Sequence, residues 1–127
     1  MQVETDDLAK IRDMCLEYYD IDEGQIEAII VYGGAAKNYV GHDYDPGDFD
    51  LNLFYHDEAD MTSTAGMPEK IGEYNGLKVE VMRNRIRDGE SVKEYIANGQ
   101  SKRWERIRRQ PIVEIYPDIR ELEWFTQ

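Results

Sequence analysis

One stretch of the chain, residues 29–54, constrains the fold more than any other. It reads IIVYGGAAKNYVGHDYDPGDFDLNLF, in which an apolar run ends in Gly33 and Gly34 and a second run carries the alternate acids Asp48 and Asp50. The second run alternates polar and apolar residues, which is typical of a β-strand with one buried face. Because alternate side chains of a strand share a face, both carboxylates emerge on the same side, a few ångströms apart. The sequence therefore predicts a platform for a divalent cation.

The paired glycines predict a phosphate contact beside that platform. Glycine permits tight turns and leaves backbone N–H groups open, and a short helix predicted over residues 35–39 points its positive end at the same spot. Lys37 and Asn38 follow the glycines closely enough to reach a phosphate. An exposed lysine near a helix start is also common, so a structural role stays open for these two residues.

A hairpin supplies the candidate for a third acid. Asn75 and Gly76 form a strong hairpin signal between alternating runs over residues 70–74 and 77–83. On the second run Glu80 lies on one face, and the valines on either side of it point from the other face into the core. We therefore expect Glu80 to face the acids of the neighbouring strand.

Local signals predict the remaining elements. Thr5 caps a helix that runs to Tyr19, with an apolar face made of Leu8, Ile11, Cys15 and Tyr18. The other predicted elements are strands over residues 26–32, 49–55 and 112–116, a polar surface loop over residues 56–68, a helix that a capping box at residues 91–94 opens and Gly99 closes, and an arginine-rich helix that Ser101 starts and Pro111 ends.

Length and composition bound the class of protein. A chain of 127 residues has the size of one domain, so we expect residues 1–127 to form a single domain. The chain shows no long apolar run and no signal-peptide pattern, which predicts a soluble, cytoplasmic protein without a membrane partner. Cys15 is the only cysteine, so no internal disulfide can form, and we expect it to be a small core residue.

The charge of the chain is lopsided. Its 27 acidic and 15 basic residues give a net charge of -12. This charge disfavours binding to nucleic acids and to membrane surfaces, and it is compatible with adaptation to high salt. Residues 83–109 invert this balance, with nine Lys or Arg against four Asp or Glu. An arginine-rich amphipathic helix is more often a solvated surface than a binding site.

The glycine pair, the alternate acids and the later acid together resemble the nucleotidyltransferase superfamily typified by DNA polymerase β. That signature is a hydrophobic residue followed by Gly and then Gly or Ser, a short spacer, an acid-hydrophobic-acid-hydrophobic motif, and a third acid on a later strand. Residues 32–34 and 48–51 fill the first two parts, and Glu80 is the candidate for the third. The resemblance covers residues 26–83.

The resemblance implies an α/β (α+β) fold with a mixed β-sheet and flanking helices, and Mg²⁺-dependent transfer of NMP from an NTP to a hydroxyl. Two Mg²⁺ ions are implied, with Asp48 and Asp50 as the paired ligands and Glu80 as the third. Gly33 and Gly34 are implied contacts of the β- and γ-phosphates. Small members of the superfamily are often found beside helical partner proteins and can act as antitoxins that modify a partner tyrosine, so a helical protein partner or a homodimer is expected.

Other interpretations remain open. The paired aspartates can belong to a solvated strand face, and Glu80 can be an ion-pair partner of Lys78 or Lys70. A nucleotidyltransferase fold can also serve as a module that binds a protein partner or a nucleotide with little turnover. RNA binding through residues 83–109 is a third possibility, which the overall acidity disfavours.

Overall fold

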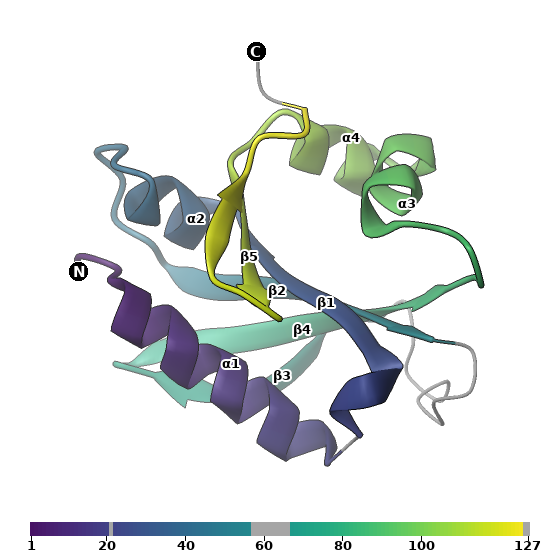
Figure 1. Cartoon of the computed structure of the whole chain (residues 1–127). Coiled ribbons are helices and arrows are strands. Elements are labelled where there is room, and N and C mark those ends of the chain that lie inside the picture. Colours follow the sequence, from purple (N-terminus) through teal and green to yellow (C-terminus); the bar gives the residue numbers. More distant parts are fainter. Residues whose placement is uncertain (21, 57–66, 126–127) are drawn as a thin grey trace.

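Six strands build one mixed β-sheet. They are β1 (Ile26–Tyr32), β2 (Asp48–His56), β3 (Glu69–Tyr74), β4 (Leu77–Ile86), β5 (Ile112–Tyr116) and β6 (Arg120–Leu122). The computed structural model describes residues 1–20, 22–56 and 67–125, and its strand order is β3-β4-β2-β1-β5-β6 (Figure 1). The β2–β4 pair is parallel and every other pair is antiparallel. Most of the predicted loop over residues 56–68 lies outside the described residues.

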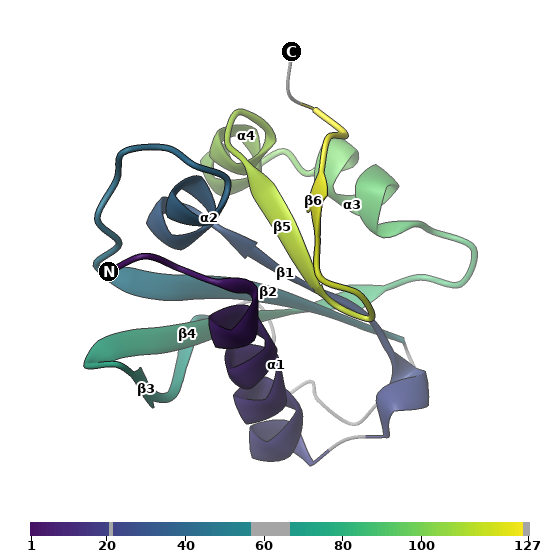
Figure 2. The ribbon, with the colours of Figure 1, turned by 60° about the vertical axis from the view of Figure 1, so that its left-hand side comes forward.

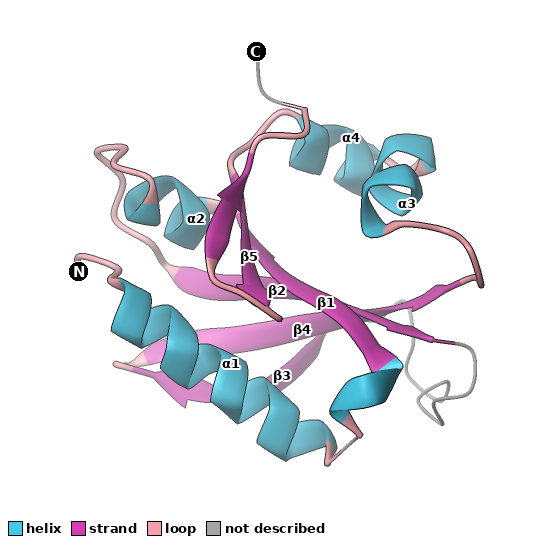
Figure 3. Cartoon of the chain, in the orientation of Figure 1, coloured by secondary structure: helices cyan, strands magenta, loops and turns pink. Residues whose placement is uncertain are grey.

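Helices cover both faces of the sheet. They are α1 (Thr5–Tyr19), α2 (Gly34–Tyr39), α3 (Val92–Asn98) and α4 (Lys102–Arg108), with a short 3₁₀ turn η1 (Glu23–Gln25) before β1 (Figure 3). Helix α1 packs on one face and the α3–α4 pair on the other, as the turned view makes plain (Figure 2). The predicted mixed sheet with flanking helices is therefore confirmed at the level of an α+β fold.

The face under α1 forms the larger apolar core. Alternate residues of β2 and β4 enter it, among them Phe49, Leu51, Val79 and Val81, all 0–1% exposed. Cys15 of α1 is also fully buried there, and burial raises the pKa of its thiol to about 12. The predictions that the valines beside Glu80 point inward and that Cys15 is a core residue are confirmed.

The opposite face is apolar only over part of its length. Phe54 of β2 packs against Tyr95 of α3 and Trp104 of α4, with ring centroids 5.4 Å and 6.2 Å away. These two helices therefore cover the carboxyl-terminal part of β2 on this face. The amino-terminal part of the same face carries the polar side chains described below.

The turns and caps that position these elements follow their local signals. Asn75 and Gly76 both have positive φ, 51° and 78°, which matches the tight hairpin turn between β3 and β4. The Ser91 hydroxyl accepts the Glu94 N–H at 3.1 Å, and the Glu94 carboxylate accepts the Ser91 N–H at 3.1 Å. The predicted capping box at the start of α3 is confirmed.

Three local predictions need correction. The N-cap of α1 is Glu4, whose N–H donates to Asp7 Oδ2 at 2.8 Å, whereas Thr5 is already helical. Tyr18 does not join the buried face of α1, because it is 48% exposed and its hydroxyl donates to Glu69 at the edge of the sheet. Residues 112–116 are not the last strand, since β6 follows and pairs with them. Within the described ranges, no helix is long and apolar enough to cross a membrane.

Candidate metal and phosphate site

The three predicted acids meet on one face of the sheet. Strands β2 and β4 run parallel in a register that places Asp50 opposite Glu80, and Asp48 lies two residues before Asp50 on the same face. One carboxylate oxygen from each of Asp48, Asp50 and Glu80 lies within 4.8 Å of the other two. Carboxylate oxygens are the preferred ligands of hard divalent cations. This cluster could hold a metal ion.

The cluster lies where the sheet face is partly open. All three acids are partly exposed, in contrast to Phe54 farther along β2, which is fully buried. An ion or a substrate can therefore approach from solvent, while the surrounding sheet still excludes much of the water. Less water means weaker screening, so the three negative charges act strongly on one another.

This crowding changes the acidity of Asp50. The pKa of its carboxyl group is raised to about 7, mainly by burial and further by the charge and hydrogen bond of Asp48 and the charge of Glu80. The nearby Lys78 offsets only part of this effect. Close carboxylates that hold a proton near neutral pH are typical of sites where a cation can take the place of that proton.

Lys78 is the cation that contacts the cluster directly. Its Nζ lies 3.0 Å from Glu80 Oε1, whereas Lys70 pairs with Glu73 at 3.1 Å. Of the two ion-pair partners that the sequence allows for Glu80, the structure selects Lys78, which is two residues away on the same strand. Lys78 is 46% exposed, so this contact is free to rearrange when a metal ion binds.

The glycine turn lies directly beside the acids. Gly33, the N-cap of α2, has φ 75° and ψ -150°, a conformation that is almost restricted to glycine. A Cβ atom placed on Gly33 would lie 3.6 Å from Asp50 Oδ2. At Gly34 a Cβ atom would lie 2.5 Å from the ring of Tyr44, so this aromatic side chain packs against the second glycine. Gly33 therefore lies against the carboxylate of Asp50, and Gly34 lies against the loop that contains Tyr44.

The two polar residues that follow the glycines have different surroundings. Lys37 Nζ lies 5.0 Å from the centroid of the Tyr44 ring, close to the glycine turn. Asn38 is buried, and its Nδ2 donates to the carbonyl oxygens of Met1 and Tyr44 at 2.9 Å and 2.7 Å. Its Oδ1 accepts the Val3 N–H at 2.7 Å. Both N–H bonds of the Asn38 side-chain amide thus donate to backbone carbonyl oxygens in this structure, and neither points to a phosphate site.

A polar cluster next to the acids was not predicted. Arg103 Nη2 donates to Asn52 Oδ1 at 2.8 Å, and Asn84 Nδ2 donates to the same oxygen at 3.1 Å. The guanidinium carbon of Arg103 lies 4.2 Å from the centroid of the Trp104 ring. One signal in the sequence points to this cluster, because Asn52 continues the alternation of Asp48 and Asp50 and so lies on their face.

Other arginines of the 83–109 segment have separate structural tasks. Arg83 is buried on the face under α1, with Nε 3.9 Å from Glu69 and its guanidinium carbon 5.3 Å from the centroid of the Tyr19 ring. Arg108 Nη1 donates to the carbonyl oxygens of Ile96 and Gly99 and so ties α4 to the end of α3. The segment is therefore not one continuous basic surface.

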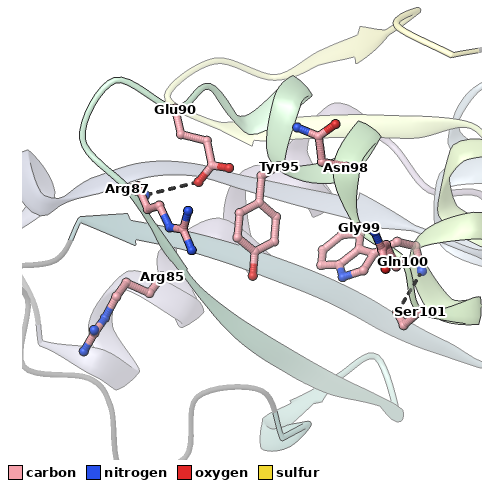
Figure 4. A pocket seen from close by; sticks show the side chains of 9 residues that line it. Arg85, Arg87, Glu90, Tyr95, Asn98, Gly99, Gln100 and Ser101 are labelled. Atoms are coloured by element: carbon pink, nitrogen blue, oxygen red, sulfur yellow. Dashed lines mark hydrogen bonds between the residues drawn. The ribbon is translucent and has the colours of Figure 1, made fainter.

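A separate pocket of about 720 Å³ opens between the end of β4 and the α3–α4 connection (Figure 4). Arg87 and Tyr95 extend toward the same space, and Trp104 contributes to its wall. The lining contains none of the three carboxylates. This basic and aromatic hollow is therefore distinct from the acidic cluster.

The acidic cluster, the glycine turn and the polar cluster together form a site that can hold a cation and an anion in contact. No protein-family model, curated protein or solved structure matches the chain.

Proposed function

We propose that this protein is a Mg²⁺-dependent nucleotidyltransferase, which moves NMP from an NTP to a hydroxyl acceptor on a fold of the DNA polymerase β type. The observation that carries the proposal is the juxtaposition of Asp48, Asp50 and Glu80 within 4.8 Å, with the backbone of Gly33 beside Asp50. Transfer of a nucleotidyl group requires a bound polyphosphate and a cation that neutralises it, and these residues supply a place for each.

The donor set fits Mg²⁺. All three side chains are carboxylates, which suit a hard cation, and the β2–β4 register fixes their separation. The raised pKa of Asp50 indicates that negative charge at this point lacks compensation. When bound there, Mg²⁺ neutralises the polyphosphate and lowers the pKa of the acceptor hydroxyl.

The remaining residues position the reactants. Asp48 and Asp50 would hold the cation from β2, and Glu80, which now contacts Lys78, would be the third ligand. The Gly33 turn lets a phosphate approach the backbone, because no side chain stands there. Lys37 lies close enough to the turn to add positive charge.

Calorimetric titration of Mg·ATP, Mg·GTP, Mg·CTP and Mg·UTP into the protein tests the proposal before an acceptor is known. We expect Mg²⁺-dependent binding of at least one NTP, lost in Asp50→Asn. Asp43→Asn is the matched control, because Asp43 is an exposed aspartate in the neighbouring loop outside the cluster. A radiolabelled NTP then tests transfer. Binding that is equal in Asp50→Asn and the wild type would refute the proposal.

The Lys78–Glu80 ion pair favours one competing function, a binding module in which Glu80 serves the sheet and turnover is weak. Glu80→Asp separates the two, because it keeps the charge of the side chain and shortens only its reach. If Glu80 is a metal ligand, the shorter side chain should weaken Mg²⁺ binding severalfold. If Glu80 is only the partner of Lys78, the variant should leave Mg²⁺ affinity unchanged and lower stability slightly.

A further inference from the structure

Arg103 is a half-buried cation that has no carboxylate partner among the described residues. Within the described residues its hydrogen bonds go to neutral amide oxygens, those of Asn52 at 2.8 Å and Asn84 at 3.5 Å. Its Nε is buried without a hydrogen-bond partner, and Nη1 makes no hydrogen bond within the described ranges. Removal from water lowers the pKa of the guanidinium group, although it remains protonated. A half-buried positive charge without a carboxylate partner favours the binding of an anion.

The contacts that hold Arg103 leave one buried polar group without a hydrogen bond. Asn52 is fully buried, and its Nδ2 has no hydrogen-bond partner in the part of the chain that the structure describes. Its Oδ1 instead accepts from both Arg103 and Asn84. A buried, unsatisfied amide is uncommon in proteins. Asn52 and Trp104, which stacks on the guanidinium group at 4.2 Å, therefore act as positioning residues for Arg103.

Arg103 lies next to the carboxylates. Asn52 is two residues after Asp50 on the same strand face, which separates their Cα atoms by about 7 Å. Tyr32 of β1 pairs with Asp50 of β2, and the charges of Arg103 and Arg106 also act on its phenol. Burial is the main reason that the pKa of Tyr32 is raised.

Arg106 adds a second positive charge. It is three residues after Arg103 and so lies on the same face of α4. It is exposed, and no carboxylate pairs with it within the described ranges, whereas Arg109, the C-cap of the same helix, pairs with Glu105 at 3.0 Å. The arginines and the carboxylates do not pair with one another, so a cation and an anion bound in contact would satisfy both groups.

We infer that Arg103 and Arg106 form a phosphate-binding subsite beside the carboxylates, on a side different from the Gly33 turn. Which molecule carries the phosphate rests on the proposed function. It is either the polyphosphate of the NTP or a phosphate of a nucleotide acceptor.

Tryptophan fluorescence tests the subsite directly. In a Trp124→Phe background Trp104 is the only tryptophan, and its ring stacks on Arg103. We expect inorganic pyrophosphate with Mg²⁺ to produce a saturable change in its emission. Arg103→Gln should weaken pyrophosphate binding about tenfold or more, as expected for the loss of a charged hydrogen-bond donor. Arg106→Gln, at an exposed position, should weaken it severalfold without affecting folding.

Two control variants make the result specific. Arg109→Gln removes an equal charge from the C-cap of α4 and should leave pyrophosphate binding unchanged. Arg87→Gln tests the separate pocket, because a phosphate there could also alter the emission of Trp104. A loss in Arg87→Gln with full binding in both Arg103→Gln and Arg106→Gln would overturn the inference, and so would the absence of any saturable change.

Further arms identify the carrier and separate this inference from the proposed function. If a saturating non-hydrolysable NTP analogue abolishes the pyrophosphate response, the subsite serves the NTP, and if a dinucleotide still binds, it serves a nucleotide acceptor. Pyrophosphate is also titrated into Asp50→Asn without Mg²⁺. Binding there that depends on Arg103 would support the subsite even if no transfer activity were found. If the wild type binds Mg·NTP and neither arginine substitution changes the affinity for Mg·NTP, pyrophosphate or the dinucleotide, the proposed function stands and the subsite is refuted.

Discussion

At the scale of single residues, Asp50 links the stability of the metal-free protein to pH. The pKa of its carboxyl group is about 7 in the folded chain and 3.8 ordinarily, so between these pH values the folded state retains a proton that the unfolded state has released. The resulting stability is fully present below pH 3.8 and is lost as the pH rises through about 7.

Asp50→Asn should remove this pH dependence. In EDTA at pH 8 we expect the variant to have a free energy of unfolding higher than the wild type by roughly 2 kcal/mol, after allowance for partial exposure and for sharing of the proton with neighbouring acids. Urea denaturation at pH 5 and pH 8 measures this difference. A difference that does not grow between the two pH values would contradict the prediction.

Replacing Gly33 should strain the backbone of the candidate site. Its φ of 75° with ψ of -150° is strained for any residue with a Cβ atom, so Gly33→Ala should lower the free energy of unfolding by about 1–3 kcal/mol. Gly47→Ala is the matched control, because a Cβ atom there meets no atom within 4 Å. Thermal denaturation compares the two variants, and equal losses would show that backbone strain at Gly33 is not the cause.

Residue-level prediction succeeded where the chemistry follows the strand alternation. Asp48, Asp50 and Glu80 could be placed on one face from sequence alone. Asn38 and Arg103 could not, because each depends on contacts between distant segments. The side-chain amide of Asn38 bonds to the backbone of Val3 near the N-terminus. Arg103 of α4 bonds to Asn52 of β2, which is close in space but distant in the sequence.

At the scale of elements, the capping box should set the stability of α3. Ser91→Ala removes the hydroxyl that accepts the Glu94 N–H, and we expect a loss of about 1 kcal/mol. Lys93→Ala is a control in the same helix, since Lys93 is exposed and both residues favour helices. Chemical denaturation measures both. A Ser91→Ala variant as stable as Lys93→Ala would indicate that tertiary packing alone holds α3.

Elements with signals between near neighbours could be predicted, and those defined by distant pairing could not. The β3–β4 hairpin and the start of α3 depend on turn and cap residues that lie together in the sequence. Strand β6 has three residues, too few for an alternating pattern, and it exists because Leu122 pairs with Ile112 of β5. The N-cap of α1 lies one residue before the predicted one. Glu4 occupies the cap position, and the hydroxyl of Thr5, the predicted cap, contacts the Tyr39 hydroxyl instead.

At the scale of the whole molecule, the net charge of -12 predicts a response to salt. Repulsion among the carboxylates weakens as the ionic strength rises, so the melting temperature should increase by several degrees between dilute buffer and molar KCl. A variant with Glu17→Gln, Glu121→Gln and Glu123→Gln, three exposed positions, should show a smaller increase. A melting temperature that does not rise would count against adaptation to high salt.

The parallel pairing of β2 with β4 also bears on the order in which the chain folds. No tight turn can join parallel strands, so the chain must close a long loop before Asp50 meets Glu80. The β3–β4 hairpin closes locally and should form sooner. The carboxylate cluster is then assembled late, and a bound cation would slow unfolding while leaving the early folding steps unchanged.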